Sequence, residues 1–245
     1  MSDKNDKTGL TINSRHLIFS KLFDHTLLKS TATKDDIFRI CDEAKDYNFY
    51  SVCLFPCFVK DAVNRLKDSA VGVVTVVGFP LGCNCSSVKV YETKQAIDDG
   101  ASEIDMVVNL GAYFEHSSRF SEDIEVVARV CGEHSVLLKT IIETSNLDTK
   151  QIEEVTKICV ESGSDYIKTS TGFSSRGCSK EDILTIQKTL ASMKLPRPIG
   201  IKASGGVRTL DQVIELVNLG ATRIGSSSAV SICKAYMEQK KSQEL

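Results

Sequence analysis

The sequence has no long hydrophobic run, no large excess of charge of either sign and no low-complexity linker. Its longest apolar runs, such as residues 71–80, are far too short to cross a lipid bilayer. The formal net charge of -2 gives no overall attraction to nucleic acid or to an anionic membrane. Neither is therefore an expected partner, and an anionic ligand would need a local binding site.

The sequence also lacks a disulfide or zinc pattern. Its nine cysteines are an odd number, and the chain starts with a polar segment rather than a secretory leader. Several of them lie in apolar segments: Cys41, Cys131, Cys159 and Cys233. Two close pairs, Cys53 with Cys57 and Cys83 with Cys85, have no partner pair at the spacing of a zinc site. We therefore expect reduced thiols, a cytoplasmic setting and no metal.

What the chain does contain is a repeated unit of strand and helix. The 245 residues, of which 42% are hydrophobic and 25% charged, suit one globular domain over residues 1–245, with flexible tails at 1–13 and 238–245. Eight strand-like runs alternate with amphipathic helical stretches: 23–27, 51–55, 71–79, 103–109, 136–143, 166–170, 199–203 and 222–225. This alternation predicts an α/β protein, a (β/α)8 TIM barrel with an extra N-terminal helix at 14–22.

Helix-end signals support these boundaries. Hydroxyl residues precede acidic first turns and are expected to cap three helices: Thr33, Ser121 and Ser179. Glycines are expected to end three helices shortly before the next strand: Gly100, Gly163 and Gly220.

Two lysines stand inside strands that should be buried on both faces. Lys168 lies within 165–172 and Lys202 within 200–206. Side chains alternate along a strand, and the apolar set must meet the outer helices, so both lysines are expected to point into the barrel. The same alternation turns Cys53, Asp105 and Lys139 inward.

Three interior lysines facing one aspartate would leave a surplus of buried positive charge. Such a surplus is usually relieved when a lysine loses its proton, and a neutral lysine is a nucleophile toward carbonyl compounds. Lys202 could lower the pKa of Lys168, and Asp105 could exchange protons with Lys202 and with a substrate through water. The alternative is a purely structural cluster of ion pairs.

A phosphate site is indicated separately. Segments 204–207 and 225–229 follow the last two strands, where barrel enzymes often bind phosphate through backbone N–H groups and a helix N-terminus. Thr171 and Gly172 could add a donor after the sixth strand. Phenylalanines before prolines, Phe55 and Phe79, are expected at the rim.

The histidines and Glu143 carry weaker signals. His16, His116 and His134 are expected to be surface or packing residues. A structural role for His25 and a role of its neighbours Asp24 or Thr26 in reaching substrate remain equally open. Glu143 is expected to pair with a lysine.

The chain resembles the deoxyribose-phosphate aldolases, a family of class I aldolases. The resemblance runs from about residue 23 to residue 229. It rests on segments 24–28 (DHTLL), 103–107 (EIDMV), 137–144 (LLKTIIET), 166–172 (YIKTSTG) and 201–208 (IKASGGVR).

The resemblance implies reversible cleavage of 2-deoxy-D-ribose 5-phosphate to D-glyceraldehyde 3-phosphate and acetaldehyde, in deoxyribonucleotide catabolism. It implies a Schiff base on Lys168, with Lys202 as proton-relay lysine and Asp105 as general acid and base. Substrate contacts are assigned to Asp24, Thr26, Cys53, Lys139 and Thr171. The phosphate site is assigned to Gly172, Gly205, Gly206, Ser227 and Ser228. No cofactor is implied, because the iminium is itself the electron sink, and a homodimer or higher homo-oligomer is expected.

Two departures from the family pattern bear on this reading. Some members carry a basic residue after the Thr-Gly of the sixth strand, where this chain has Phe173, so Arg176 could substitute for it. Some members end in a tyrosine that reaches the active site, whereas this chain ends in Leu245. Two other hypotheses remain: a Schiff-base lyase for another phosphorylated sugar, and a catalytically silent metabolite-binding barrel.

Overall fold

The computed structural model describes residues 19–195 and 197–243, and its centre is a closed barrel of eight parallel strands. The strands pair in chain order, and β8 returns to β1. Their bounds are β1 Phe23–Leu27, β2 Ser51–Leu54, β3 Gly72–Val77, β4 Glu103–Val107, β5 Leu137–Ile141, β6 Tyr166–Lys168, β7 Gly200–Ser204 and β8 Arg223–Ser226. The predicted (β/α)8 barrel is confirmed, and each of the eight predicted strands is present.

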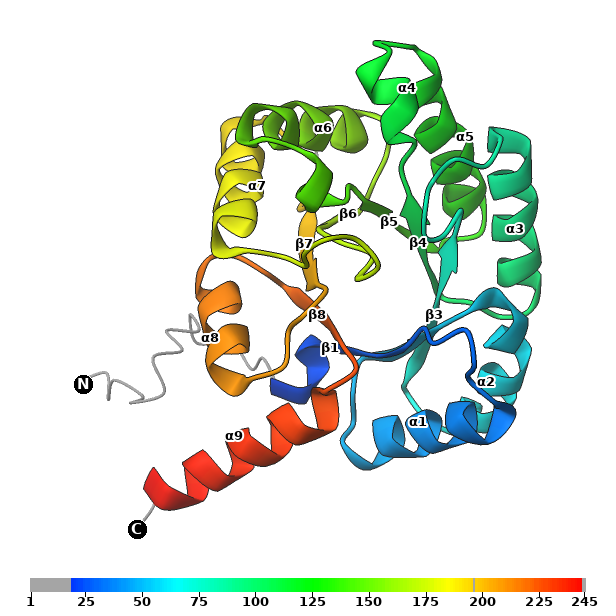
Figure 1. Ribbon diagram of the computed structural model, residues 1–245. Coiled ribbons are helices and arrows are strands. Elements are labelled where there is room, and N and C mark those ends of the chain that lie inside the picture. Colours follow the sequence, from blue (N-terminus) through cyan, green and yellow to red (C-terminus); the bar gives the residue numbers. More distant parts are fainter. Residues whose placement is uncertain (1–18, 196, 244–245) are drawn as a thin grey trace.

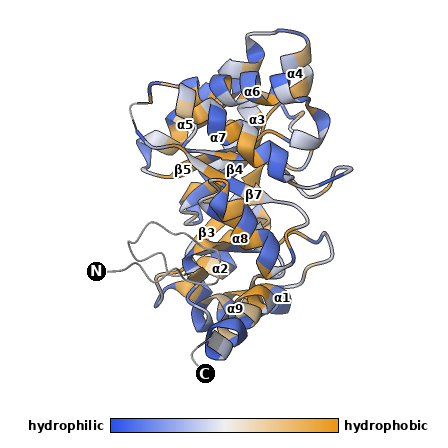
Figure 2. Ribbon diagram, turned by 90° about the vertical axis from the view of Figure 1, so that its left-hand side faces the viewer, coloured by the Kyte–Doolittle hydropathy of each residue, from blue (hydrophilic) through white to orange (hydrophobic). Residues whose placement is uncertain are grey.

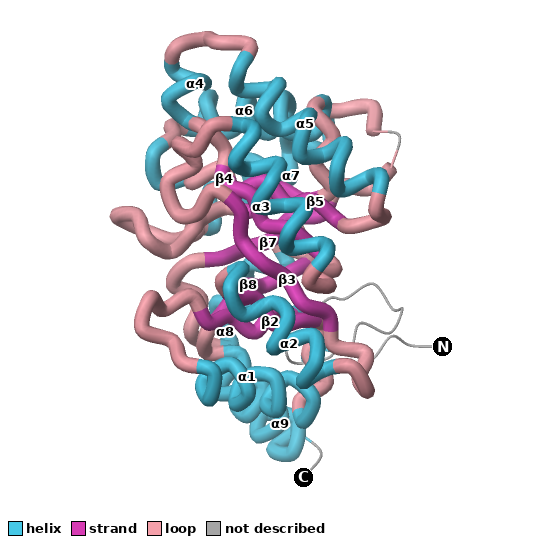
Figure 3. Tube along the Cα trace, turned by 90° about the vertical axis from the view of Figure 1, so that its right-hand side faces the viewer, coloured by secondary structure: helices cyan, strands magenta, loops and turns pink. Residues whose placement is uncertain are grey.

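Helices surround this ring of strands on its outside (Figure 1). Their bounds are α1 Lys34–Asp46, α2 Val59–Leu66, α3 Ser86–Asp98, α4 Leu110–Phe114, α5 Arg119–Glu133, α6 Thr149–Glu161, α7 Lys180–Ser192, α8 Leu210–Asn218 and α9 Ala229–Gln243. Short 3-10 turns occur at η1 Phe19–Leu22, η2 Pro56–Phe58 and η3 Thr144–Asn146. In side view the strands lie inside the helices, with loops at both ends of the barrel (Figure 3). None of the helices in the described residues is long and apolar enough to cross a membrane.

The two ends of the chain differ from expectation where they are described. Of the helix expected at 14–22, residues 14–18 lie outside the described residues, and residues 19–22 form the 3-10 turn η1 rather than an α-helix. Residues 238–243, expected in a C-terminal tail, are the last residues of α9. Lys240 and Lys241 lie in the final turn of that helix, where positive charge is favourable to the helix dipole.

Helix ends follow the sequence signals with one exception. Thr33 and Ser179 accept hydrogen bonds from the third helical residue and complete capping boxes with Asp36 and Asp182. Ser121 is not a cap, because α5 begins two residues earlier with Ser118 at its N-cap. The three glycines expected after helices all have positive φ: Gly100, Gly163 and Gly220.

The apolar core has two parts. The larger part lies between strands and helices and includes Phe23, Ile104 and Ile167, which point away from the barrel axis. The outer helices carry hydrophobic and hydrophilic residues side by side, as expected of helices with one face on the core and the other in solvent (Figure 2). A smaller group, Cys53, Val74 and Val76, packs separately, with Phe55 and Phe79 partly buried against it. The charged residues described next come from the other strands.

Candidate active site

Seven charged side chains meet inside the barrel. They come from six strands: Asp24 from β1, Glu103 and Asp105 from β4, Lys139 from β5, Lys168 from β6, Lys202 from β7 and Arg223 from β8. All are at most 3% exposed. The strand register places Asp105 beside Lys139 and Lys168 beside Lys202.

Asp105 accepts a hydrogen bond from each of the three interior lysines. Its Oδ2 accepts hydrogen bonds from Lys168 Nζ and Lys202 Nζ, each at 2.7 Å. Its Oδ1 accepts a hydrogen bond from Lys139 Nζ at 2.7 Å. Burial opposes the ionised form of Asp105, but the attraction of Lys139, Lys168 and Lys202 outweighs it and holds its pKa well below the ordinary value. Asp105 is therefore a carboxylate at neutral pH.

The interior holds more carboxylates than the sequence indicated. Asp24 pairs with Lys202, and its Oδ1 accepts a hydrogen bond from Arg223 Nη1 at 2.7 Å. Burial opposes the charged form of Lys202, yet Asp105 and Asp24 raise its pKa above the ordinary value. The expected ratio of three lysines to one aspartate is thus wrong, because Asp24 and Glu103 also face inward.

A cavity of about 250 Å³ opens beside Lys168, between the loops that follow β1, β6, β7 and β8. Seven predicted site residues line it: Lys168, Thr26, Thr171, Gly172, Gly205, Gly206 and Ser227. Five others lie fully buried in the barrel interior and do not line it: Asp24, Cys53, Asp105, Lys139 and Lys202. Ser228 does not line it either, and its backbone N–H donates to Ser226 Oγ at 2.9 Å. Of the three predicted catalytic residues, Lys168 alone reaches the cavity.

The interior residues fall below the cavity because inward residues of a barrel stack in layers. Cys53 illustrates this: its Sγ contacts Asp105 Oδ2 at 3.9 Å, and burial raises the pKa of its thiol. A second cavity, of about 350 Å³, lies behind the glycine loop between α7 and α8. It contains none of the interior charged residues.

Backbone geometry shapes the part of the cavity wall that Gly205 forms. Gly205 has φ +83°, and a Cβ on Gly177 would stand 1.9 Å from the Gly205 carbonyl oxygen. Only two glycines can pass each other this closely. The loop after β7, which lines the cavity with Gly205 and Gly206, therefore packs backbone to backbone against the loop that holds Gly177.

Glu143 orients Thr171 rather than pairing with a lysine. Glu143 has φ +48°, uncommon for a residue with a side chain, and is 5% exposed. Its carboxylate accepts hydrogen bonds from the Thr171 hydroxyl and backbone N–H. The Thr171 oxygen in turn accepts a hydrogen bond from Phe173 N–H at 3.1 Å. Because the hydroxyl proton is directed at Glu143, the remaining capacity of the Thr171 oxygen is as an acceptor for a ligand hydroxyl.

Arg176 does not take the place of a basic residue at Phe173. Its guanidinium donates to both carboxylate oxygens of Asp182, at 2.5 and 3.1 Å, and to the Thr144 carbonyl. Two basic residues that were not predicted as site residues, Lys29 and Arg208, line the cavity instead.

An aromatic contact crosses the mouth of the barrel. The ring of Phe173, after β6, lies 5.3 Å from the ring of Phe79, after β3, in edge-to-face geometry. Phe79 also contacts Phe55 at 5.9 Å. The expected rim residues are therefore joined by Phe173, which lines the cavity.

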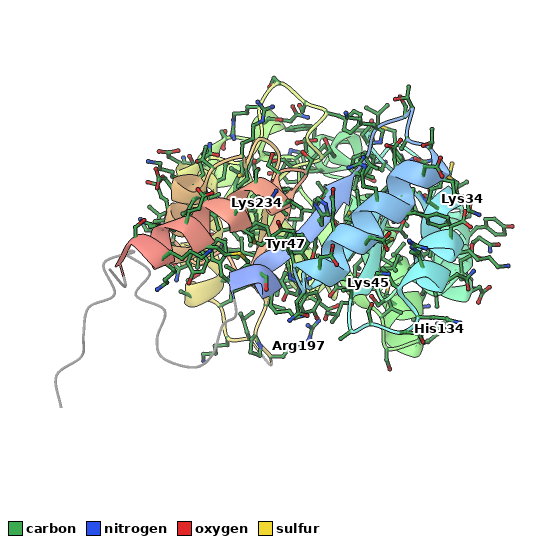
Figure 4. The ribbon with its side chains drawn as sticks, turned by 90° about the horizontal axis from the view of Figure 1, so that it is seen from below. Lys34, Lys45, Tyr47, His134, Arg197 and Lys234 are labelled. Carbon is green, nitrogen blue, oxygen red and sulfur yellow. The ribbon has the colours of Figure 1, made fainter. Side chains whose placement is uncertain are left out.

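The described histidines lie outside the cavity. His25 Nε2 lies 2.6 Å from Glu43 Oε2 of α1, so this side chain faces the helix layer. His116 and His134 are exposed, and His134 lies at the periphery (Figure 4). His16 falls outside the described residues. Within 19–195 and 197–243, no cluster of His, Cys, Asp and Glu could hold a metal ion.

Fold and site together define a (β/α)8-barrel enzyme with an amine at the edge of a glycine-lined cavity. The family model for DeoC/LacD family aldolases matches residues 18–235. A deoxyribose-phosphate aldolase of Caldicellulosiruptor saccharolyticus is 47% identical over 215 residues, 87% of this chain and 96% of that protein. The chain therefore belongs to the DeoC/LacD aldolase family, whose members are lyases.

Two solved structures agree with this assignment. The aldolase QR15 is 35% identical with a TM-score of 0.84, covering 92% of this chain and 98% of QR15. The deoxyribose phosphate aldolase of Aeropyrum pernix, described as a tetramer, is 28% identical with a TM-score of 0.82. That alignment covers 89% of this chain and 90% of the Aeropyrum chain.

Proposed function

We propose that this protein is a class I aldolase that reversibly cleaves 2-deoxy-D-ribose 5-phosphate to D-glyceraldehyde 3-phosphate and acetaldehyde, with Lys168 forming the Schiff base. The observation that carries the proposal is the position of Lys168. Among the interior charged residues it alone lines the cavity, and its one ion-pair partner is Asp105. An open-chain sugar phosphate placed there has its aldehyde at Lys168 and its phosphate toward Gly205, Gly206 and Ser227.

The reaction would begin when Lys168 Nζ attacks C1 of the sugar and water leaves, giving a protonated imine. The C3 hydroxyl then loses its proton, and the C2–C3 bond breaks. The electrons of the O–H bond form the new aldehyde, and those of the C2–C3 bond pass to the imine as an enamine. After glyceraldehyde 3-phosphate departs, C2 takes up a proton and water hydrolyses the imine to acetaldehyde and the free amine.

Asp105 and Lys202 are the proposed proton carriers. Both meet Lys168 at Asp105 Oδ2, and although neither lines the cavity, a water molecule between this carboxylate and the substrate could link them to the reacting oxygens. Lys139 and Asp24 hold this pair in place. Thr171 is proposed to accept a hydrogen bond from a substrate hydroxyl.

Trapping the Schiff base tests the proposal. Incubation with acetaldehyde and a borohydride reductant should leave an ethyl group on the peptide that contains Lys168, and Lys168→Leu should abolish it. The surface variant Lys34→Leu, on α1, is the matched control (Figure 4). Failure to trap, with unchanged ligand binding in Lys168→Leu, would favour a silent binding barrel. Trapping without turnover of deoxyribose 5-phosphate would favour a lyase for another phosphorylated sugar.

We further propose a cytoplasmic location and a homodimer or higher homo-oligomer, with neither nucleic acid nor membrane as partner and no cofactor. All nine cysteines are free thiols, which supports a reducing compartment. The tetrameric Aeropyrum protein supports self-association.

A further inference from the structure

Six of the seven interior charged residues form a closed ring in which positive and negative side chains alternate. We call this group the charge ring: Asp105, Lys139, Glu103, Arg223, Asp24 and Lys202. Successive members contact each other. Lys139 Nζ lies 2.6 Å from Glu103 Oε2, which lies 3.2 Å from Arg223 Nη1. Arg223 Nη1 also forms an ion pair with Asp24 at 2.7 Å. Lys202 forms ion pairs with both Asp24 and Asp105, which closes the ring.

The charge ring is electrically neutral, because three carboxylates face three cations. Lys168 is attached to it through Asp105 and is the one cation in excess among these seven residues. The members whose pKa is displaced all favour their charged forms. Burial opposes this in each case, but the neighbouring opposite charges lower the pKa of Asp24 and Asp105 and raise those of Lys139, Lys202 and Arg223. The charge of Lys168 is therefore the one that the interior carboxylates do not balance.

Resting on the proposed Schiff-base function of Lys168, we propose that Glu103 and Arg223 are positioning residues, which set through the charge ring the pH at which the Lys168 amine becomes reactive. Neither residue lines the cavity. Both are the first residues of their strands, β4 and β8, so they lie at the end of the barrel away from the cavity. They would act on Lys168 by their charge alone.

Two further cations, Lys29 and Arg208, line the cavity with Lys168, and both are exposed to solvent, which screens their charge. The remaining groups that face the charge ring leave its charge count unchanged. Tyr166, from β6, and Tyr50, before β2, lie over the Arg223 guanidinium at 5.4 and 3.4 Å. Cys53, from β2, is a buried thiol whose pKa is raised by burial, so it is uncharged. β3 contributes Val74 and Val76 to the interior.

The two residues should act in opposite directions. Glu103→Gln removes a negative charge, so the interior repels the Lys168 proton more strongly and the amine becomes reactive at lower pH. Arg223→Met removes a positive charge, so the proton is held more tightly and reactivity requires higher pH. At an effective dielectric constant of ~20, each change should move the midpoint by roughly one pH unit or more.

The experiment is reductive trapping of acetaldehyde on Lys168 as a function of pH, with the modified peptide quantified by mass spectrometry. Wild type, Glu103→Gln, Arg223→Met and the double variant are compared. We expect a lower midpoint, a higher midpoint and, in the double variant, a return toward wild type, because one charge of each sign has been removed. Arg223→Lys keeps the charge and should stay near wild type. Should Arg223→Met not fold, Glu103→Gln and Arg223→Lys still decide the question.

Asp123→Asn is the matched control. Asp123 forms a buried ion pair with Lys89 at 2.5 Å, between α3 and α5, outside the barrel interior. Loss of this pair should weaken the fold without moving the trapping midpoint. Midpoints that stay at the wild-type value in folded Glu103→Gln, or that move the same way in both single variants, would overturn the role of the charge ring. Absence of any adduct on wild-type Lys168 would instead overturn the proposed function.

Discussion

At the scale of single residues, Glu143 is held in a left-handed backbone conformation that costs energy. This residue follows β5 and has a φ of +48°. Its buried carboxylate accepts a hydrogen bond from the Thr171 hydroxyl. Strain of about 1–3 kcal/mol persists only where the surroundings impose it, and it concentrates at functional sites. The contact directs the Thr171 oxygen toward the cavity.

We expect Glu143→Gln to lower kcat/KM for deoxyribose 5-phosphate roughly tenfold, because a charge-assisted hydrogen bond that orients Thr171 is weakened. Trapping of acetaldehyde on Lys168 should stay at the wild-type level, since acetaldehyde has no hydroxyl to meet Thr171. Glu154→Gln, which removes a carboxylate bonded to Tyr113 away from the cavity, is the control. A parallel loss of trapping in Glu143→Gln would mean that Glu143 acts on the lysine instead.

Alternation along strands predicted the inward direction of Asp105, Lys139, Lys168 and Lys202, but not their depth. The same rule turns Glu103, two residues before Asp105, inward, and this was missed because it opens its strand. Arg223 was also missed: the strand predicted over 222–225 begins one residue later, at Arg223, and no inward face was assigned to it. Asp24 was expected to reach substrate and instead belongs to the charge ring, since depth is set by barrel stagger and not by spacing within a strand.

At the scale of elements, Asp182 joins α7 to the loops after β5 and β6. Its carboxylate accepts hydrogen bonds from the Ser179 N–H, the Thr144 hydroxyl and Arg176. Burial opposes ionisation, but these hydrogen bonds lower the pKa of Asp182 below the ordinary value. The carboxylate therefore stabilises the fold above the unfolded pKa of about 3.9, and this contribution is lost as pH falls through the folded pKa.

Asp182→Asn should reduce the free energy of unfolding by about 2 kcal/mol at pH 7, from loss of the charge-assisted hydrogen bonds. Urea unfolding at several pH values should show the gap between variant and wild type closing as pH falls below about 4. Glu181→Gln, an exposed change in the same helical turn, is the comparison. A gap that stays constant down to acidic pH would show that the Asp182 charge contributes nothing.

Strands and most helix ends were predictable because local pattern determines them. Contacts between loops were not. The ring of Phe173 meets Phe79 across the barrel mouth, and Arg176 turns to Asp182 rather than to the cavity. Both depend on closure of the barrel, which brings together loops far apart in the sequence.

At the scale of the whole molecule, the cavity lies over the seam where the first strand of the barrel pairs with the last. β1 pairs with β8, and the cavity is lined by Thr26 and Lys29 after β1 and by Ser227 after β8. A phosphate bound there, as proposed, would contact segments that follow both the first and the last strand of the sheet. Its binding free energy should therefore stabilise the closed barrel as a unit.

Inorganic phosphate at about a hundred times its Kd should raise the melting temperature by roughly 5–10 °C, from a linkage gain of about 2.7 kcal/mol and the size of the chain. We expect the double variant Lys29→Ala/Arg208→Ala to bind phosphate at least tenfold more weakly and to lose about half of this gain. The loss should be greatest at low ionic strength, because both side chains are exposed. Any general effect of phosphate as a solute is shared by all variants and cancels in the comparison.

Arg176→Ala is the opposing control. The Arg176 guanidinium is hydrogen-bonded to Asp182, so this variant should lower the melting temperature without reducing the gain from phosphate. Loss of the gain in Arg176→Ala, with full retention in the double variant, would return the phosphate contact to Arg176.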